Sequence, residues 1–131
     1  MTVDYLINLF KNCEHFNGFK IGAGFLLEKS NSVSVVPDGE ESVIRTYCDG
    51  AKIKSIGFSL IIRLASDFGD NSGHFAFLDK ISRWIDSYKN FPEGFQYEPL
   101  RFEIVKGAKL TEDNVHSLKY NIKCRFLYLQ E

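Results

Sequence analysis

The sequence has almost no net charge, few cysteines and no long hydrophobic run, and each of these absences argues against a class of protein. Its 131 residues include 16 lysines and arginines and 17 aspartates and glutamates, so the formal net charge is -1. Proteins that bind bare phosphate surfaces normally carry an excess of basic residues, and free DNA is therefore not an expected ligand. No apolar run is long enough to span a bilayer, and no basic start precedes an apolar run. We expect a protein that is made and kept in the cytosol.

The cysteines are too few and too scattered for a disulfide framework or a zinc site. Cys13, Cys48 and Cys124 are odd in number, none belongs to a C-x-x-C pair, and no histidine stands beside them at metal-ligand spacing. Free cysteines in such a pattern behave as small apolar side chains in a reducing compartment. The sequence therefore predicts three buried, unpaired thiols and no metal.

What the chain does contain is an ordinary globular composition. Hydrophobic residues make up 44% of the chain and charged residues 25%. A chain of this length buries roughly 65 to 70% of the surface that it exposes when unfolded, which is enough for a core without metals or disulfides. With no internal repeat and no low-complexity segment, residues 1–131 are expected to form a single domain.

The hydrophobic periodicity predicts an α+β fold, in which a mostly antiparallel sheet with a long β-hairpin packs against an N-terminal helix and a central amphipathic helix. Thr2 is the expected N-cap of the first helix, and Asn17-Gly18 stops it. The central helix covers about 74–89, and its apolar stripe contains Phe77, Ile81, Trp84 and Tyr88, widened by Leu78 and Ile85. Strands are expected at about 25–28, 33–36, 43–48, 51–65, 100–106 and 118–128, with an acidic, turn-like segment at 110–115. In the last strand the apolar residues point one way, while Lys119, Asn121, Lys123 and Arg125 point the other.

A hairpin around Asp49-Gly50 is the strongest turn signal in the chain, because a two-residue turn that matches strand twist needs positive φ at both central positions. The strand after it would be about 50 Å long at 3.3 Å per residue, whereas a compact domain of this size is about 35 Å across. The hairpin should therefore curve strongly or project from the body. Lys52 and Lys54 lie near its tip, on the same face as the apolar residues of the base. Two interpretations stay open, an arm that grips a neighbouring subunit and a twisted hairpin with a solvated end.

Catalytic patterns fail on residue type or spacing. Gly22-Ala23-Gly24 lacks the third glycine of a dinucleotide loop and the lysine of a P-loop. His15, His74 and His116 stand in separate segments beside turns, where solvated histidines are common. No G-x-S-x-G occurs, and Asp67 with Asp70 is only a fragment of a calcium loop, more typical of a charged soluble loop. We predict no enzyme, no cofactor and no metal.

Several segments resemble a phage family when they are taken in order. The helix segment Phe77–Ile85, then Phe91-Pro92, and finally Leu118–Tyr128 look like the small minor capsid or tail completion proteins of Gram-positive siphophages. Val43–Gly50 resembles the K-x-Y-x-D-G hairpin of the same family, with Arg45 at the position of the lysine and Cys48 at the variable position between the tyrosine and the aspartate. The likeness spans 43–131, and the N-terminal third matches only in a short helix and an acidic, proline-bearing turn. The layout is also similar to the tail terminators of long non-contractile tails.

This resemblance implies a homo-oligomeric ring, expected to hold six copies, that caps the tail tube, stops its growth and presents a surface to the head connector. It implies a place in the virion, at the head-tail junction, where DNA passes through the ring without specific binding. The residues themselves fix no copy number. The candidate assembly contacts are Arg45, Tyr47, Asp49, Lys52, Lys54, Asp67, Phe68 and Asp70.

Two alternatives from other classes stay open. One is a small-molecule or protein-binding α+β domain, in which a curved sheet closes over the Trp84 helix and leaves an apolar pocket. The other is an enzyme whose residues meet only in the fold, such as His74 with Asp70 or Asp79.

Overall fold

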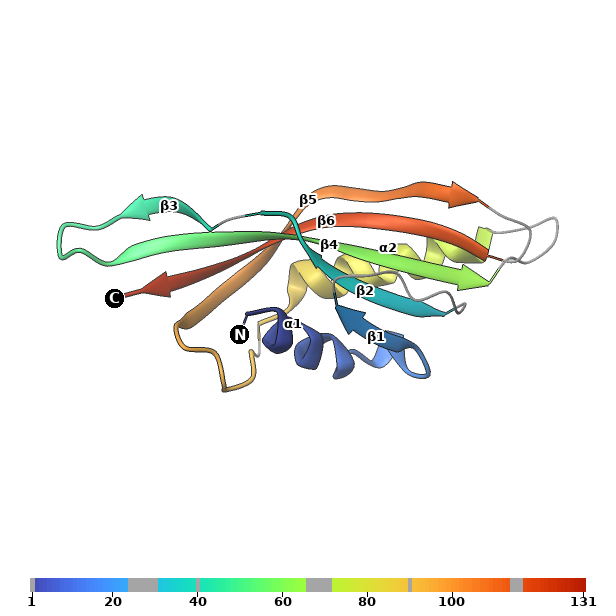
Figure 1. Cartoon of the computed structure of the whole chain (residues 1–131), viewed down its shortest axis with the longest axis horizontal. Helices are drawn as coiled ribbons and strands as arrows, with labels where there is room; N and C mark the ends of the chain where they lie inside the picture. Colours follow the sequence, from blue (N-terminus) through green and yellow to red (C-terminus); the bar gives the residue numbers. More distant parts are fainter. Residues whose placement is uncertain (1, 24–30, 40, 66–71, 90, 114–116) are drawn as a thin grey trace.

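The computed structural model describes residues 2–23, 31–39, 41–65, 72–89, 91–113 and 117–131, and it confirms the expected α+β class. The described chain forms an elongated molecule built on one mixed sheet (Figure 1). Its elements in order are α1 (Thr2–Lys11), the 3-10 helix η1 (Glu14–Phe16), β1 (Lys20–Ala23), β2 (Ser32–Pro37), β3 (Ser42–Thr46), β4 (Lys52–Ala65), α2 (Ser72–Ser87), β5 (Glu98–Asp113) and β6 (Ser117–Gln130).

The sheet has six strands, in the order β1-β2-β4-β6-β5, and β3 pairs with β4 off this path. β1 and β2 are parallel, and every other pair is antiparallel. β2 pairs with β4 from Phe58 to Arg63, whereas β3 pairs with its first residues, from Lys52 to Ser55. β2 and β3 therefore lie end to end along the same edge of β4.

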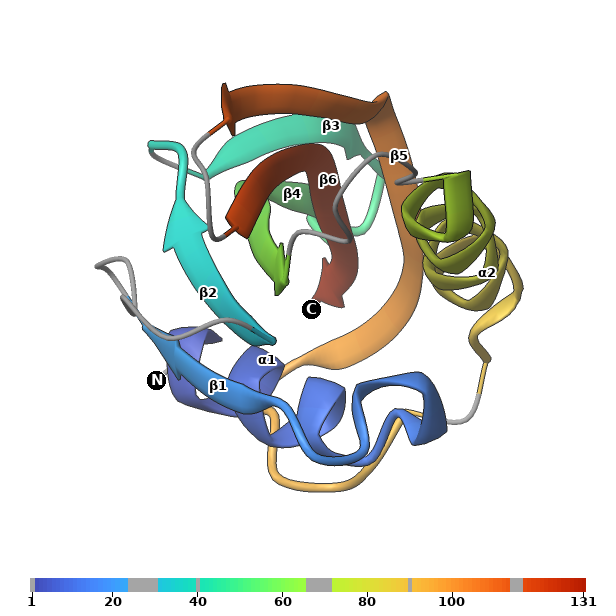
Figure 2. The ribbon, with the colours of Figure 1, turned by 90° about the vertical axis from the view of Figure 1, so that its right-hand side faces the viewer.

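The two central strands run nearly the whole length of the molecule. β4 pairs with β6 in unbroken register from Lys52 opposite Gln130 to Ala65 opposite Ser117, which confirms the long strand that the alternation predicts. The strands curl around the long axis, with α1 beside β1 and α2 beside β5 (Figure 2). The β3 end also extends past both helices (Figure 1). The long hairpin thus belongs to a curved sheet, and its β3 end also projects from the body of the molecule (Figure 1, Figure 2).

The core lies between the helices and one face of the sheet. Aromatic rings join its layers: the Phe10 ring of α1 lies 5.8 Å from the rings of both Phe102 on β5 and Trp84 on α2. On α2, Leu78, Ile81 and Ile85 are buried completely or nearly so, while Trp84 is half-buried. The predicted apolar stripe of α2 is confirmed at Ile81, but Leu78 and Ile85, which were expected only to widen it, are buried more deeply than Phe77, Trp84 and Tyr88.

The end of β5 differs from the prediction. The sequence predicts a strand ending near Lys106 and a turn-like 110–115, but β5 continues to Asp113. Several register shifts against β6, including one between Lys106 and Lys109, absorb the extra residues of this half. This half of β5 shows no alternation of apolar and polar residues, because residues 105 to 111 are exposed on both faces of the strand. Its main-chain pairing with β6 therefore decides its conformation.

The N-terminal region differs as well. α1 ends at Lys11, before the predicted stop, and η1 follows it. A short strand forms at Lys20–Ala23, where no strand is expected from the sequence. The strand expected at 25–28 lies outside the described residues. In the part of the chain that the structure describes, neither helix is long and apolar enough to cross a membrane.

Candidate functional site: the β3–β4 arm

The end of the molecule that carries β3 is the strongest candidate for an assembly site. We call residues 41–54, which contain β3, its turn and the start of β4, the arm. No helix covers this end in Figure 1, and each residue from 41 to 50 is exposed. A strand that is exposed on both faces and pairs only along one edge leaves a row of main-chain groups open to another chain.

The tip of the arm does not form the predicted two-residue turn. The Tyr47 N–H donates to the Ala51 carbonyl at 2.8 Å and the Gly50 N–H donates to the Tyr47 carbonyl at 3.0 Å, which gives a three-residue loop. Gly50 alone takes a positive φ, of +91°, whereas Asp49 does not. The reason is that the Asp49 Oδ1 accepts the Ala51 N–H at 3.0 Å and satisfies the backbone of a type I turn followed by a left-handed glycine.

The predicted assembly residues on the arm form two local contacts. The Arg45 guanidinium carbon lies 5.1 Å from the centre of the Tyr47 ring, in cation-π geometry. The Lys54 Nζ lies 3.7 Å from a Glu41 carboxylate oxygen. Lys52 is exposed. Arg45, Tyr47, Asp49, Lys52 and Lys54 thus all lie on the arm, and among these five the Arg45–Tyr47 pair is in contact.

Two apolar residues of the arm were missed as site residues. Val43 is 53% exposed and Ile44 47% exposed, values typical of surface polar residues rather than of β-branched side chains in a strand. Val43 pairs with Lys54 and Arg45 pairs with Ile53, which leaves Ile44 as the extra residue of a bulge. Their adjacency in a strand was visible in the sequence, but nothing there indicates that no helix covers them.

The remaining candidates fall outside the described residues. Asp67, Phe68 and Asp70, with the calcium hypothesis that used two of them, lie in 66–71, and His116 lies in 114–116.

His74 is not the solvated histidine that its sequence context suggested. Its Nε2 lies 2.9 Å from the Ala65 carbonyl oxygen and its Nδ1 lies 3.1 Å from the Tyr120 hydroxyl. A carbonyl only accepts, so Nε2 carries the hydrogen and a neutral ring accepts the Tyr120 hydroxyl hydrogen at Nδ1. Asp79, one proposed acidic partner, instead pairs with Arg83 at 3.0 Å. The His74 imidazole on α2 therefore links the end of β4 to β6, and each of its two nitrogens has a hydrogen-bond partner.

The cysteines divide by environment. Cys13 and Cys124 are buried, as predicted, but Cys48 is exposed at the tip of the arm, which corrects the expectation that all three are internal. Burial, with the nearby charges of Asp86 and Asp38, raises the pKa of the Cys124 thiol to about 12. Burial also raises the pKa of Cys13. Both internal thiols are therefore protonated at neutral pH and chemically inert.

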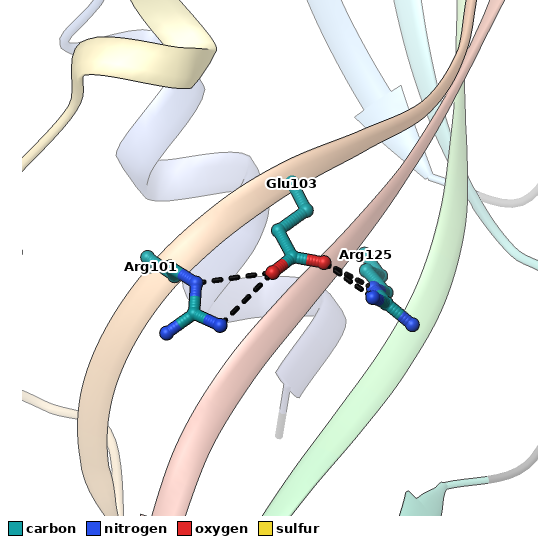
Figure 3. A network of polar contacts seen from close by, with 3 residues as sticks. All are labelled: Arg101, Glu103 and Arg125. Carbon is teal, nitrogen blue, oxygen red and sulfur yellow. Dashed lines mark hydrogen bonds and ion pairs between the residues drawn. The ribbon is translucent and has the colours of Figure 1, made fainter. Parts of the chain in front are cut away.

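A charged cluster stands near the base of the arm (Figure 3), where Glu103 lies between two arginines. One Glu103 oxygen accepts from Arg101 Nε at 3.0 Å, and the other accepts from Arg125 Nε at 2.6 Å and Nη2 at 2.5 Å. Partial burial by itself raises the pKa of the Glu103 carboxyl, but the hydrogen bonds and charges of both arginines outweigh it and lower the pKa below 4.5. The cluster joins β5 to β6.

An open hollow of about 280 Å³ lies beside this cluster, on the sheet face opposite the helices. Its lining includes Lys123, Arg125, Asp38 and the hydroxyls of Ser42 and Ser55. Its walls are mixed polar and apolar. A separate hollow of about 450 Å³ is lined by Trp84, Ser87, Tyr88 and Lys89, but it is open and also mixed in polarity, not the closed apolar pocket of the small-molecule alternative. Within the described ranges, no three or more histidine, cysteine or acidic side chains are grouped so that they could hold a metal ion.

No protein-family model matches the sequence, and no curated protein matches it significantly. The resemblance to phage tail completion proteins therefore remains an expectation that rests on the residue patterns quoted above.

Proposed function

We propose that the protein is a structural subunit of a long-tailed phage, which closes with copies of itself into a ring, caps the tail tube, ends tail polymerisation and joins the tail to the head connector. The observation that carries the proposal is the arm. An exposed strand edge with Val43, Ile44 and Tyr47 on its surface extends beyond the helices. Such an edge pairs readily with a strand of another chain.

A closed ring needs two different surfaces on each subunit, because a head-to-tail joint repeats by rotation. The outer half of β5 is the second surface. It is exposed throughout 105–111, and it carries Val105 at 56% and Leu110 at 45% exposure. β3 and this half of β5 lie at opposite ends of the molecule (Figure 1). In the proposed ring, the arm of one copy reaches the outer half of β5 of the next.

The phage assignment draws on the order of the motifs. The segment that resembles the K-x-Y-x-D-G hairpin corresponds to the arm, and the Trp84 segment and the final strand of the resemblance correspond to α2 and β6. Six copies, the tube and connector as partners, and the place in the virion are taken from that resemblance. The arm supports the more general part of the proposal, which is self-assembly.

The test is solution mass, measured by light scattering over a wide concentration range and followed by negative-stain images of any large species. The double variant Val43→Ser/Ile44→Ser removes the exposed apolar residues of the arm, and because both are exposed it should change the free energy of unfolding by no more than about 0.5 kcal/mol. Lys80→Ser is the control, because Lys80 is exposed in the middle of α2, away from both the arm and the outer half of β5 (Figure 1).

Rings with an open centre from the wild type and the Lys80→Ser variant, together with a folded monomer from the arm variant, would support the proposal. A wild type that stays monomeric at every concentration, or an arm variant that still forms rings, would contradict assembly through the arm.

A further inference from the structure

The face of the sheet opposite the helices carries a concentration of positive charge that the near-zero net charge conceals. On β6 the residues of this face are Lys119, Asn121, Lys123 and Arg125. The register places Lys106 of β5 directly opposite Lys123, Lys109 opposite Asn121, and Arg63 of β4 opposite Lys119. Directly opposed residues of antiparallel strands project from the same face. Arg63 is buried at 9% exposure, so the lysines and Arg125 form the surface that we call the basic face.

The pairing of Lys106 with Lys123 is unfavourable for the isolated protein. Like charges directly opposite each other across two strands repel. Lys106, Lys109 and Lys123 are exposed, and none of the three forms an ion pair within the described part of the chain. A bound anion would relieve this repulsion.

Two acids that share the basic face, Glu103 and Asp38, form no ion pair with Lys106, Lys109 or Lys123. Glu103 is held between Arg101 and Arg125. Asp38, at the edge of the hollow, accepts the Ser59 hydroxyl at 3.0 Å with each carboxylate oxygen. Glu112 is paired with Lys119, which lies two residues before Asn121, the partner of Lys109, on β6.

The chemistry of the basic face favours nucleic acid over an acidic protein. Lysine is depleted in protein-protein interfaces, which need a buried aromatic or arginine anchor at their centre. Lysine side chains instead suit phosphates, which they contact as point charges without base recognition. No aromatic side chain lies among the paired residues of this face, so it has no platform for stacking unpaired bases.

We propose that the basic face binds the phosphate backbone of duplex DNA without reading its sequence. From Lys119 to Arg125 the row is about 20 Å long at 3.3 Å per residue, a length over which duplex DNA presents roughly a dozen phosphates. Exposed lysines on two adjacent strands can follow that backbone. The proposal does not depend on the arm or on ring closure.

The test is fluorescence anisotropy with a labelled 30-base-pair duplex of arbitrary sequence, titrated with the protein at sodium chloride concentrations between 50 and 200 mM. The variant is Lys106→Gln/Lys123→Gln. The control, Lys80→Gln/Lys89→Gln, removes the same charge from exposed positions on and just after α2. Circular dichroism of each variant establishes that it is folded.

We expect the wild type and the control to bind equally, and Lys106→Gln/Lys123→Gln to bind at least tenfold more weakly at 50 mM salt. Each lost phosphate contact lowers the slope of log affinity against log salt by about 0.9, so that slope should fall by about 2 in the variant. No duplex binding by the wild type at 50 mM salt, or equal weakening by the control, would overturn the proposal. Binding of polyglutamate in preference to the duplex would also overturn it, and would assign the basic face to an acidic protein.

Discussion

At the scale of single residues, Glu103 shows how the sheet fastens its edge strand near the base of the arm. Its carboxylate accepts hydrogen bonds from arginines on both sides, and the contact with Arg125 crosses from β5 to β6. Hydrogen bonds between charged groups in this fork geometry are stronger than those between neutral groups, but partial exposure to solvent reduces their net value.

The lowered pKa of Glu103 makes its contribution depend on pH. A carboxyl whose pKa is lower in the folded state stabilises the fold above its unfolded pKa, and this stabilisation is lost as the pH falls through the folded pKa. We expect Glu103→Gln to reduce the free energy of unfolding by about 1 kcal/mol at pH 7. The difference from the wild type should shrink as the pH falls below 4.5. Urea unfolding across this range measures both.

Glu98→Gln is the control for this prediction. Glu98 lies on the same strand and is exposed. An equal loss of stability in both variants, or a loss in Glu103→Gln that persists unchanged at low pH, would show that the charge contacts do not stabilise the edge.

At the scale of elements, β5 is a strand with two different halves. Its first half carries Phe102, which is 3% exposed and packs against Phe10 and Phe126 in the core. Its second half is exposed, shifts register against β6 and places Lys106 opposite Lys123. Only the first half can gain stability from burial, so the second half is held mainly by its main-chain pairing.

The lysine pair gives a prediction in which stability and binding move in opposite directions. Lys106→Glu replaces a repulsive cross-strand pair with an attractive one, and should raise the free energy of unfolding by about 0.5 kcal/mol. The same substitution should weaken duplex binding, if the basic face binds phosphates as proposed. Thermal unfolding gives the first result and the anisotropy titration gives the second.

Lys109→Glu is the matched change for the stability effect, because Lys109 lies opposite Asn121 rather than a lysine. A stability gain as large in this variant as in Lys106→Glu would mean that general charge balance, and not the opposed pair, is responsible.

At the scale of the whole molecule, the long axis separates surfaces with different properties. The arm stands at one end, the outer half of β5 at the other, and the helices cover one face of the sheet between them (Figure 1). This layout suits a subunit that meets neighbours at two ends. The basic face lies opposite the helices, and its two β5 lysines, Lys106 and Lys109, belong to the outer half of β5 that the neighbouring arm would approach in the proposed ring.

Cys48 reports on this arrangement without any added probe. It is the exposed thiol at the arm tip, whereas Cys13 and Cys124 are buried with raised pKa values. We expect Ellman's reagent at pH 8 to modify only Cys48 in the native monomer, and all three cysteines after unfolding in guanidinium.

If the arm lies in the joint between subunits, the rate of Cys48 modification should fall at least tenfold in the assembled fraction. Cys48→Ser is the control, and it should abolish the native reaction. Equal Cys48 rates in monomer and assembly would exclude the arm tip from the joint, while rapid reaction in Cys48→Ser would show that a buried thiol is accessible.

The sequence by itself determined the class of fold and the faces of its main elements. Alternation along β4 and β6 identified which side chains enter the core, because a strand places successive residues on opposite faces. The helical spacing of α2 likewise identified its buried stripe. Lys52 and Lys54 were correctly assigned to the region near the tip of a long hairpin, opposite Thr46 and Val43.

Only the tertiary structure decided what covers each surface, since coverage depends on segments that are distant in the chain. Val43 and Ile44 read as ordinary strand residues, and their exposure follows from where the helices end. Cys48 was predicted to be buried, because its sequence context likewise does not show that no helix covers the arm. The basic face depends on the register of β5 against β6, in which bulges bring Lys106 opposite Lys123. Local patterns specify which way a side chain points, but long-range pairing specifies what it meets.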